Sequence, residues 1–441
     1  MDENNSPKRF SSLQSWGWIF FLIILACTIY SYFKYIRLVP FHPDESTNLY
    51  MSSDFDLLWS DPRDMFWDIN HENDAQQHYR KLDPPLTRYL LGAGRTIAGL
   101  PTLTADWDWG KSWEQNEGDG AFPSKKLLAA GRWSVALLLP FSIILLYLIG
   151  KHIDGDLTGA LAVLFLITNS LLMLHTRRAM AEGILVFAVC FAIWSFMLGY
   201  KYPWLAGIGM ALAFNAKQST AALFPAGLIA VLIPTNTNEK SFPKWLDAAI
   251  QYVSLFIIIT FILNPLWWQN PISAIKSSIN ARQELLARQV ADTERLAPEK
   301  VLHSSSQRVA ALFYNLYLAE PMFAEVGNYQ AQTKAMEETY LIIPIQNLFR
   351  HPISAGILLT LSLFGFSIGL LRIIKHRNKQ SRHLLLLFLA TISQGAAIIW
   401  FIPLPWQRYL MPLIPFACLW MAFGAAQIIH LFCSNNRDYQ K

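Results

Sequence analysis

Two adjacent carboxylates, Asp44 and Glu45, follow the first long apolar run of the sequence, in the stretch FHPDESTNLY (41–50). Like charges at a partly desolvated membrane surface repel each other, which raises the pKa of at least one carboxyl group. A carboxylate with a raised pKa suits general-base chemistry. The alternative is a solvated start of a polar loop. Asp44 and Glu45 are therefore candidate catalytic residues.

A third acid, Glu182, lies in the first turns of an otherwise apolar segment, after HTRRAMA (175–181). An ionisable side chain within a membrane-spanning helix is energetically costly and is by default a functional candidate. Arg178 precedes it by four residues and would lie on the same helix face, so an ion pair that closes the helix end is the alternative. We expect Glu182 to be the second acid of the site.

Four basic residues, Arg177, Arg178, Lys217 and Arg408, lie close to the ends of apolar segments. Guanidinium and ammonium groups bind phosphate and stabilise it as a leaving group. A lipid-linked phosphate carries its charge at about this depth of a membrane, so these residues are candidates for a phosphate site. Each residue taken alone is better explained by snorkelling to the interface, and only the cluster indicates a site.

Metal ligands are weaker candidates. His42 with Asp44 and Glu45 could hold a divalent metal, and so could HENDAQQH (71–78), which contains His71, Glu72, Asp74 and His78. The spacing matches no strong metal signature, and a hydrophilic loop is the better interpretation of 71–78. No phosphate-binding loop, dinucleotide motif or nucleophile elbow indicates another cofactor or chemistry.

The elements that must position these residues are membrane helices. The chain has 441 residues, of which 53% are hydrophobic, and its apolar residues gather into blocks long enough to cross a bilayer. We expect an all-α polytopic membrane protein with about ten spans. The blocks are 15–33, 127–150, 157–174, 179–199, 204–216, 219–233, 247–267, 352–374, 383–402 and 409–432. The pair 204–216 and 219–233 could equally form one re-entrant hairpin.

The distribution of Lys and Arg predicts the orientation, because short basic loops stay in the cytoplasm. The run RIIKHRNKQSR (372–382) and both termini are placed inside, while two long polar stretches, 35–126 and 268–350, are placed outside. The expected organisation is a cytoplasmic N-terminus (1–14), a catalytic transmembrane module (15–267) that includes the first extracytoplasmic loop, a second loop (268–350), and C-terminal helices with a cytoplasmic tail (351–441). The candidate site residues then share one extracytoplasmic face.

The net charge, the cysteines and the tryptophans of the sequence indicate no further kind of site. The net charge of +5 comes largely from the inner loops, and no basic stripe indicates nucleic-acid binding. The four cysteines, Cys27, Cys190, Cys418 and Cys433, fall in or beside spans and predict no disulfide framework. Six tryptophans near the outer interface are mostly expected to anchor the protein, although a minority could stack on a sugar ring. They are Trp107, Trp109, Trp113, Trp267, Trp268 and Trp406.

The order of these motifs resembles a known group of enzymes. PDE (43–45) directly after the first span and PPLTRY (84–89) resemble elements of the protein O-mannosyltransferases. HTRRAMAEGILVF (175–187), LAFNAKQSTAALFP (212–225) and QRYLMPLIPF (407–416) are similar to stretches of bacterial family-39 and aminoarabinose-transferase-like enzymes. These are integral-membrane glycosyltransferases of the GT-C class, and the similarity extends from the first span to the last.

The resemblance implies a GT-C-like architecture, a polyprenyl-phosphate-linked sugar as donor, an extracytoplasmic active site under the first loop, and inversion at the anomeric carbon. It implies Asp44 as the base that deprotonates an acceptor hydroxyl on a lipid, glycan or protein, with Glu45 beside it and Glu182 as the second acid. Arg88 falls where the mannosyltransferases have a lysine and is thereby a further candidate for binding the donor phosphate, and Lys217 and Arg408 fall in elements near the lipid-phosphate site.

Two departures from the family pattern affect the acceptor and the metal. Asp83 stands where the mannosyltransferases have His, and the 268–350 loop is too small for a large soluble domain, which weakens any argument for a protein acceptor. Some relatives use a divalent metal and others do not. A hexosyl- or pentosyltransferase is the favoured function. The alternatives are a transporter or flippase for a lipid-linked or anionic solute, and a non-catalytic membrane scaffold.

Overall fold

Every regular element is helical in the residues that the computed structural model describes, which are 12–71, 74–233, 242–325, 329–376 and 378–438. The expectation of an all-α protein is therefore confirmed for the described chain. The helices fall into three groups, which are the long apolar helices, a cluster of short helices from the first polar stretch, and the helices of the second polar stretch.

The apolar group comprises α1 (Ser12–Lys34), α7 (Lys125–Ala136), α8 (Leu139–Asp154), α9 (Asp156–Ile167), α11 (Ala181–Leu198), α12 (Pro203–Ala216), α13 (Phe224–Leu232), α14 (Phe242–Leu263), α18 (Pro352–Lys375), α19 (Lys379–Phe401) and α20 (Ile414–Asp438). The first polar stretch forms α2 (Pro43–Tyr50), α3 (Asp54–Ser60), α4 (Ala75–Leu82), α5 (Leu86–Ile97) and α6 (Trp113–Gly118). The second forms α15 (Pro271–Leu296), α16 (Ser305–Phe313) and α17 (Gln330–Leu341). The short helix α10 (Ser170–His175) precedes α11.

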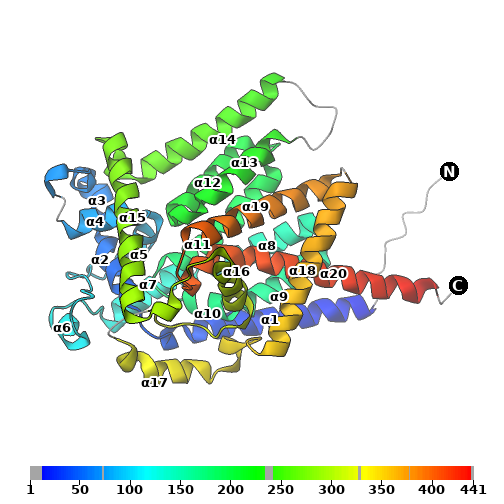
Figure 1. Ribbon diagram of the computed structural model, residues 1–441, viewed down its shortest axis with the longest axis horizontal. Coiled ribbons are helices and arrows are strands. Elements are labelled where there is room, and N and C mark those ends of the chain that lie inside the picture. The colour runs from blue at the N-terminus through cyan, green and yellow to red at the C-terminus, as the bar shows by residue number, and fades with distance from the viewer. Residues whose placement is uncertain (1–11, 72–73, 234–241, 326–328, 377, 439–441) are drawn as a thin grey trace.

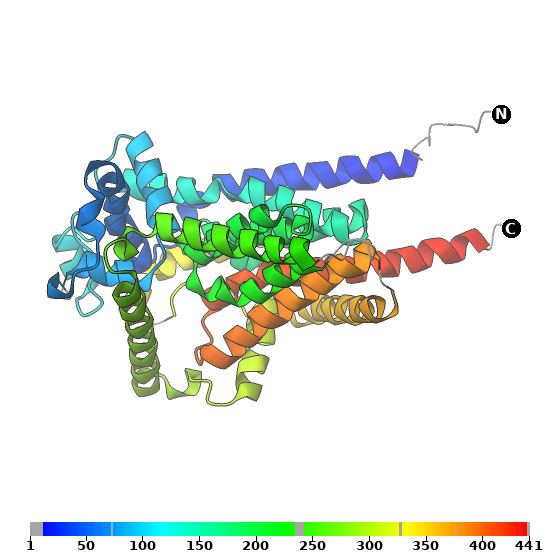
Figure 2. The same cartoon turned by 90° about the horizontal axis from the view of Figure 1, so that it is seen from above.

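The two polar stretches gather at one end of the helix bundle. Both views place α2 to α6 at the end opposite to the outer ends of α1 and α20 (Figures 1 and 2). The helix α15 runs across the direction of the long helices rather than along it (Figure 1). The arrangement agrees with a bundle whose first and last helices start and finish on the same side.

Six helical segments of the described chain are long and apolar enough to cross a membrane: Lys125–Asp154, Ala181–Leu198, Trp245–Leu263, Pro352–Lys375, Lys379–Phe401 and Gln407–Phe432. Four more apolar helices are shorter: Trp18–Lys34, Asp156–Ile167, Pro203–Ala216 and Gln218–Leu232. Together they coincide with the ten apolar blocks of the sequence. A total of ten spans stays a prediction, because the four shorter helices include the pair that could form a re-entrant hairpin.

The blocks 127–150 and 157–174 are interrupted where the sequence predicts single spans, the first by a turn at residues 137–138 between α7 and α8. The run 157–174 is divided between α9, which ends at Ile167, and α10, which begins at Ser170. Asn169 lies between them and its Oδ1 accepts the N–H of Leu172 at 3.1 Å, an N-cap that starts a new helix. The apolar run 157–174 therefore forms two helices, and its crossing of the membrane stays a prediction.

The centre of the bundle is formed by α11 and α20. The residues of both helices are largely buried, whereas α14 and α18 expose most of their apolar side chains at the periphery. Small residues allow the close contacts, since a Cβ on Gly365 of α18 would lie 2.2 Å from the carbonyl oxygen of Trp420 in α20. The two central helices matter for the site because Glu182 begins α11 and Arg408 lies in the 3₁₀ segment Gln407–Leu413, which leads into α20.

Candidate active site

The local sequence HPDE forces Asp44 and Glu45 apart. His42 is the N-cap of α2, with Pro43 in the first turn, and its Nδ1 accepts the N–H of Asp44 at 3.1 Å. Glu45 completes a capping box, since its Oε2 accepts the N–H of His42 at 3.1 Å. Successive residues of a helix point about 100° apart. The two carboxylates therefore face different surroundings.

Glu45 is fully buried against α7. Its Oε1 accepts from Arg132 Nε at 2.8 Å and its Oε2 from Arg132 Nη2 at 2.7 Å, and Oε1 also accepts the N–H of Ala179 at 2.9 Å. Burial acts to raise the pKa of Glu45, but the Arg132 guanidinium outweighs it and holds that pKa below its ordinary value. The bidentate pair fastens α2 to the bundle.

Asp44 faces Arg408, which comes from the other end of the chain. Its Oδ2 accepts from Arg408 Nη1, and its side chain is 29% exposed. Burial acts to raise the pKa of Asp44, but the Arg408 charge lowers it below the ordinary value. The expectation that repulsion between Asp44 and Glu45 raises one pKa is therefore wrong, because each carboxylate has its own arginine.

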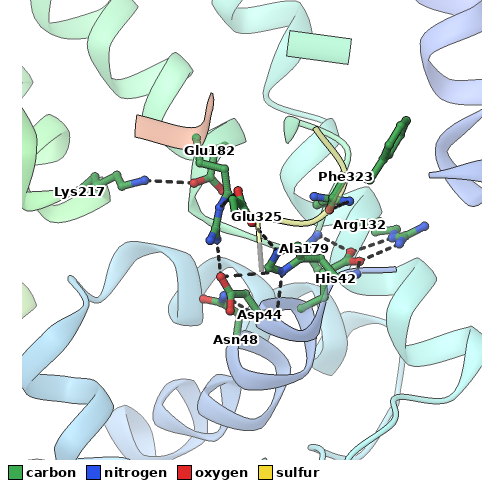
Figure 3. Close-up of polar contacts among 12 residues, drawn as sticks. His42, Asp44, Asn48, Arg132, Ala179, Glu182, Lys217, Phe323 and Glu325 are labelled. Atoms are coloured by element: carbon green, nitrogen blue, oxygen red, sulfur yellow. Dashed lines mark hydrogen bonds and ion pairs between the residues drawn. The ribbon is translucent and has the colours of Figure 1, made fainter. Parts of the chain in front are cut away.

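An acid that the sequence interpretation missed, Glu325, also binds Arg408. Its Oε1 accepts from Arg408 Nε at 2.6 Å, and its Oε2 lies 3.1 Å from His42 Nε2 (Figure 3). Glu325 is buried although it belongs to the second polar stretch. The one signal in the sequence is its setting in PMFAEVGNY (321–329), where an acid interrupts apolar and aromatic residues.

Glu182 pairs with a lysine at the end of a neighbouring helix. Lys217 caps the C-terminus of α12, and its Nζ lies 3.1 Å from Glu182 Oε1 (Figure 3). Glu182 is 2% exposed, and its Oε2 has no hydrogen-bond partner in the described part of the chain. The partner expected four residues earlier, Arg178, instead donates from Nη2 to the carbonyl oxygen of Phe323 at 2.8 Å. The interpretation of Glu182 and Arg178 as a simple helix-end pair is therefore wrong.

Asp44, Glu182, Lys217 and Arg408 line one cavity of about 490 Å³. Its other walls come from the first polar stretch, from α15, from the segment around Glu325 and from residues 406–409. They include Thr47, Asn48, His78, Tyr79, Asp83, Thr87, Trp109, Arg282, Arg288, Gln289, Asp292, Glu325, Trp406 and Tyr409. The cavity therefore brings together Asp44, Glu182, Lys217 and Arg408 from four distant parts of the sequence, which the predicted topology places on one face.

Three other predicted cations do not line this cavity. Arg177 is buried, donates to Gln346 Oε1 at 2.8 Å and lies 4.7 Å from the centre of the Tyr32 ring. Arg178 is equally buried. Arg88 binds Asp54 at 2.8 Å. Their positions do not support the expected role in phosphate binding and indicate that they hold the loops and helices together.

The weak metal candidates do not form a set of ligands. Asp44 and Glu45 face separate arginines, and both ring nitrogens of His42 have hydrogen-bond partners. Over the described ranges, no three His, Cys, Asp or Glu side chains are grouped as metal ligands would be. These residues as arranged do not fit a metal.

The stretch 71–78 is divided among several roles. His71 binds Asp68 at 2.8 Å, Asp74 caps α4, and His78 lines the cavity. Glu72 lies outside the described residues. The hydrophilic-loop interpretation of this stretch agrees with these positions.

The helix α15 supplies a wall that the sequence analysis treated as loop. Arg282 and Arg288 line the cavity from this helix, and Arg282 Nη1 lies 3.9 Å from Asp83 Oδ1 across it. Trp109, Trp406 and Tyr409 add aromatic surface, with Trp406 and Tyr409 stacked at 5.6 Å between ring centres. A charged yet aromatic cavity suits a ligand that combines a phosphate with a sugar ring or an isoprenoid.

Comparison with known proteins agrees with the motif order. The model of the dolichyl-phosphate-mannose-protein mannosyltransferase family matches residues 66–277, just under half of the chain. The matched segment contains Glu182 and Lys217 but not Asp44 or Arg408. The resemblance to this family that the motifs indicate is thereby confirmed. No curated protein sequence matches the chain significantly.

A solved structure shares the architecture. ArnT from Cupriavidus metallidurans, in a crystal structure bound to undecaprenyl phosphate, matches with a TM-score of 0.51 and 12% sequence identity, over 92% of this chain and 60% of that one. The chain has the GT-C fold. The oligosaccharyltransferase AglB from Archaeoglobus fulgidus, in complex with an inhibitory peptide and a dolichol-phosphate, matches with a TM-score of 0.49 and 13% identity over 95% of this chain and 52% of that one. The chain therefore spans between about half and three fifths of the length of these two GT-C structures.

Proposed function

We propose that the protein transfers a hexose or pentose from a polyprenyl-phosphate-linked donor to an acceptor hydroxyl, on the extracytoplasmic face of a membrane and with inversion. The observation that carries the proposal is the shared cavity, in which Asp44 and Glu182 face Lys217 and Arg408. The family match and the undecaprenyl phosphate bound by ArnT support this donor class.

In this proposal Asp44 is the general base. Because Arg408 keeps its carboxylate ionised, Asp44 can accept a hydrogen bond from the acceptor hydroxyl before the reaction begins. The acceptor oxygen then attacks the anomeric carbon from the face opposite to the phosphate. As the new C–O bond forms, the hydroxyl proton passes to Asp44 and the bond from the anomeric carbon to the phosphate oxygen breaks.

Lys217 and Arg408 would stabilise the departing phosphate. Both line the cavity. Glu325 binds the single N–H of Arg408 Nε and Asp44 binds one N–H of Nη1, so three of the five N–H groups of the guanidinium have no hydrogen-bond partner among the described residues and can bind a ligand. Fixed cations that face a developing negative charge lower the barrier without reorganisation during the reaction. Glu182 would orient Lys217 through Oε1 and accept a hydrogen bond from a sugar hydroxyl at Oε2, which has no partner among the described residues.

Glu45 has a different role from its neighbour in this proposal. Its carboxylate is fully engaged by Arg132 and Ala179 and does not line the cavity. It would therefore position Asp44 by fixing the first turn of α2. Arg88, Arg177 and Arg178 would likewise support the site from outside.

The decisive experiment is transfer from labelled polyprenyl-phosphate sugars by the purified protein and its Asp44→Asn variant. Replacing the base should lower kcat by about 10²- to 10⁴-fold, the usual contribution of general-base catalysis. The matched control is Asp64→Asn, an exposed acid of the same polar stretch that does not line the cavity. Full activity of Asp44→Asn with an active control would remove Asp44 from the mechanism.

A second experiment tests the phosphate site. Lys217→Glu reverses a charge that faces the cavity and should weaken binding of a polyprenyl phosphate at least tenfold, as expected when a charged partner of a phosphate is lost. Lys276→Glu on α15 reverses a charge that does not line the cavity and serves as control. Unchanged affinity of the Lys217 variant would contradict the assignment.

A further inference from the structure

Four residues form a closed ring at the wall of the cavity, namely His42, Asp44, Arg408 and Glu325. Asp44 and Glu325 bind two different nitrogens of the Arg408 guanidinium, Nη1 and Nε. Glu325 and Asp44 are joined again through His42, which contacts the carboxylate of one and the backbone N–H of the other (Figure 3). Three remote segments of the sequence therefore meet in one hydrogen-bonded ring.

The geometry fixes which atoms carry protons. The N–H of Asp44 donates to His42 Nδ1, so Nδ1 must have a free lone pair and the ring proton of neutral His42 lies on Nε2. Nε2–H then donates to Glu325 Oε2 at 3.1 Å, while Arg408 Nε–H donates to Oε1 at 2.6 Å. Both oxygens of Glu325 accept hydrogen bonds, an arrangement that favours the ionised carboxylate. Burial acts to raise the pKa of Glu325, but Arg408 and His42 hold that pKa below its ordinary value.

The ring carries one more negative than positive charge. Asp44 and Glu325 are anionic, Arg408 is cationic and His42 is neutral in this arrangement. If Glu325 were absent, Arg408 and Asp44 would form a neutral pair, and the guanidinium would attract either Asp44 or an incoming phosphate more strongly. Glu325 therefore competes with Asp44 and with a bound phosphate for interaction with the Arg408 guanidinium.

We propose that Glu325 is a positioning residue for the transfer reaction, which holds Arg408 by its Nε edge and limits how strongly Arg408 binds both Asp44 and the lipid phosphate. The inference rests on the proposed function. Glu325 acts through Arg408 and His42 and does not itself touch the reacting atoms. Because Glu325 weakens the binding of Arg408 to these two groups, the product phosphate leaves readily and Asp44 stays available to the acceptor hydroxyl.

The variant Glu325→Gln tests the inference because its amide cannot replace the carboxylate. The amide has one acceptor oxygen, so it can satisfy Arg408 Nε or His42 Nε2 but not both, and it removes the competing charge. We expect polyprenyl phosphate alone to bind about threefold more tightly or better, in the range of a partly exposed ion pair. We expect kcat for transfer to fall about tenfold or more, for two reasons. The complex with the lipid phosphate is stabilised in the ground state, and Asp44 becomes a weaker base when Arg408 binds it more strongly.

The comparison uses the full chain purified in detergent, with three further variants. Glu325→Asp restores the charge and should recover part of kcat, although its side chain is shorter. Glu320→Gln alters an exposed acid of the same segment that contacts Asn347 at 3.2 Å, and should change neither quantity. In an Arg408→Gln background, Glu325→Gln should have little further effect on kcat, because residues that act through one another are not additive.

The outcomes separate this inference from the proposed function. Weaker or unchanged lipid-phosphate binding by Glu325→Gln, or an equal loss of kcat with and without Arg408, would overturn the positioning role even if Asp44→Asn is inactive. An active Asp44→Asn variant would instead contradict the proposed function, while the binding comparison still decides the effect of Glu325 on Arg408. If Glu325→Gln does not fold, Glu325→Ala gives the answer, because it also removes the competing charge, and wild-type values of lipid-phosphate affinity and kcat in that variant would contradict the inference.

Discussion

Asp44 and Glu45 show how two neighbouring residues of one type acquire different roles. Glu45 is enclosed by Arg132 and a backbone N–H, whereas Asp44 reaches the cavity and shares Arg408 with Glu325. The sequence identifies both acids as exceptional because they follow an apolar run, but it cannot say which arginine each will meet. The difference leads to separate predictions for the two residues.

The pH dependence of transfer should depend on the ion pair between Asp44 and Arg408. Burial and Glu325 raise the pKa of Asp44, whereas Arg408 and His42 lower it, and the net direction is downward. We expect the acidic limb of kcat/KM to lie below the ordinary aspartate pKa of about 3.9, and to move upward in Arg408→Gln because burial and Glu325 then dominate. The measurement is kcat/KM against pH for both proteins, with Arg63→Gln, an exposed arginine of the first polar stretch, as control. An acidic limb at the same pH in Arg408→Gln would show that Arg408 does not control this titration.

Replacing Glu45 should lower the stability of the fold, because its carboxylate is buried in an ion pair with Arg132 and does not line the cavity. Removing one partner of a buried ion pair costs about 3–5 kcal/mol, so Glu45→Gln should lower the thermal unfolding midpoint markedly, and the double change Glu45→Gln with Arg132→Met should recover part of the loss. Because the folded-state pKa of Glu45 is lowered, the stabilisation is present above the ordinary glutamate pKa and is lost as the pH falls through the folded-state value.

The control for Glu45 is an exposed ion pair of the same type. Arg295 and Asp292 lie 3.0 Å apart on α15 with both side chains largely exposed, and such pairs contribute about 0–1 kcal/mol. Arg295→Gln should therefore leave the unfolding midpoint nearly unchanged. Equal midpoints for the Glu45 and Arg295 variants would show that the buried pair does not hold α2 to the bundle.

At the scale of elements, the sequence predicts the apolar helices well and the polar stretches poorly. Hydrophobic runs are a local property, so all ten blocks correspond to helices, and Glu182, Lys217 and Arg408 are recognisable as charges at their ends. The partners of those charges depend on contacts between remote segments, which a single sequence does not record. Glu325, Arg282 and Arg288 were missed for this reason, and Arg88, Arg177 and Arg178 were assigned to phosphate although their partners lie elsewhere.

The start of α11 offers a test of how helix packing positions an acid. A Cβ on Gly183 would lie 2.2 Å from Val135 Cγ1 in α7, so Gly183→Ala forces a shift between α7 and the first turn of α11, which carries Glu182. We expect transfer to fall at least tenfold although every charged residue is kept, because small misplacements of a catalytic group cost up to about 10²-fold. The control is Gly356→Ala in α18, where an added Cβ meets no atom within 4 Å. Wild-type kcat for Gly183→Ala would show that the position of Glu182 is not limiting.

For the molecule as a whole, the sequence predicts a site on the side of the membrane opposite to both termini. The structure agrees with the relative placement, since the helices of the first polar stretch lie at the end away from the start of α1 and the end of α20 (Figure 2). Which end is extracytoplasmic depends on the positive-inside distribution of Lys and Arg, a property of membrane insertion rather than of packing. Sidedness therefore needs a test of its own.

Single cysteines at the two ends of the bundle give that test. In a background with Cys27 and Cys433 replaced by serine, Glu117→Cys would lie on exposed α6 near the site, and Gln380→Cys would lie at the exposed start of α19 beside the basic run 372–382. A membrane-impermeant thiol reagent added to intact cells should label position 117 and leave position 380 unlabelled until the membrane is permeabilised. Retained transfer activity in each variant shows that the protein is folded. Labelling of position 380 alone in intact cells would place the cavity on the cytoplasmic face of the membrane. That result would contradict both the expected orientation and sugar transfer on the extracytoplasmic face.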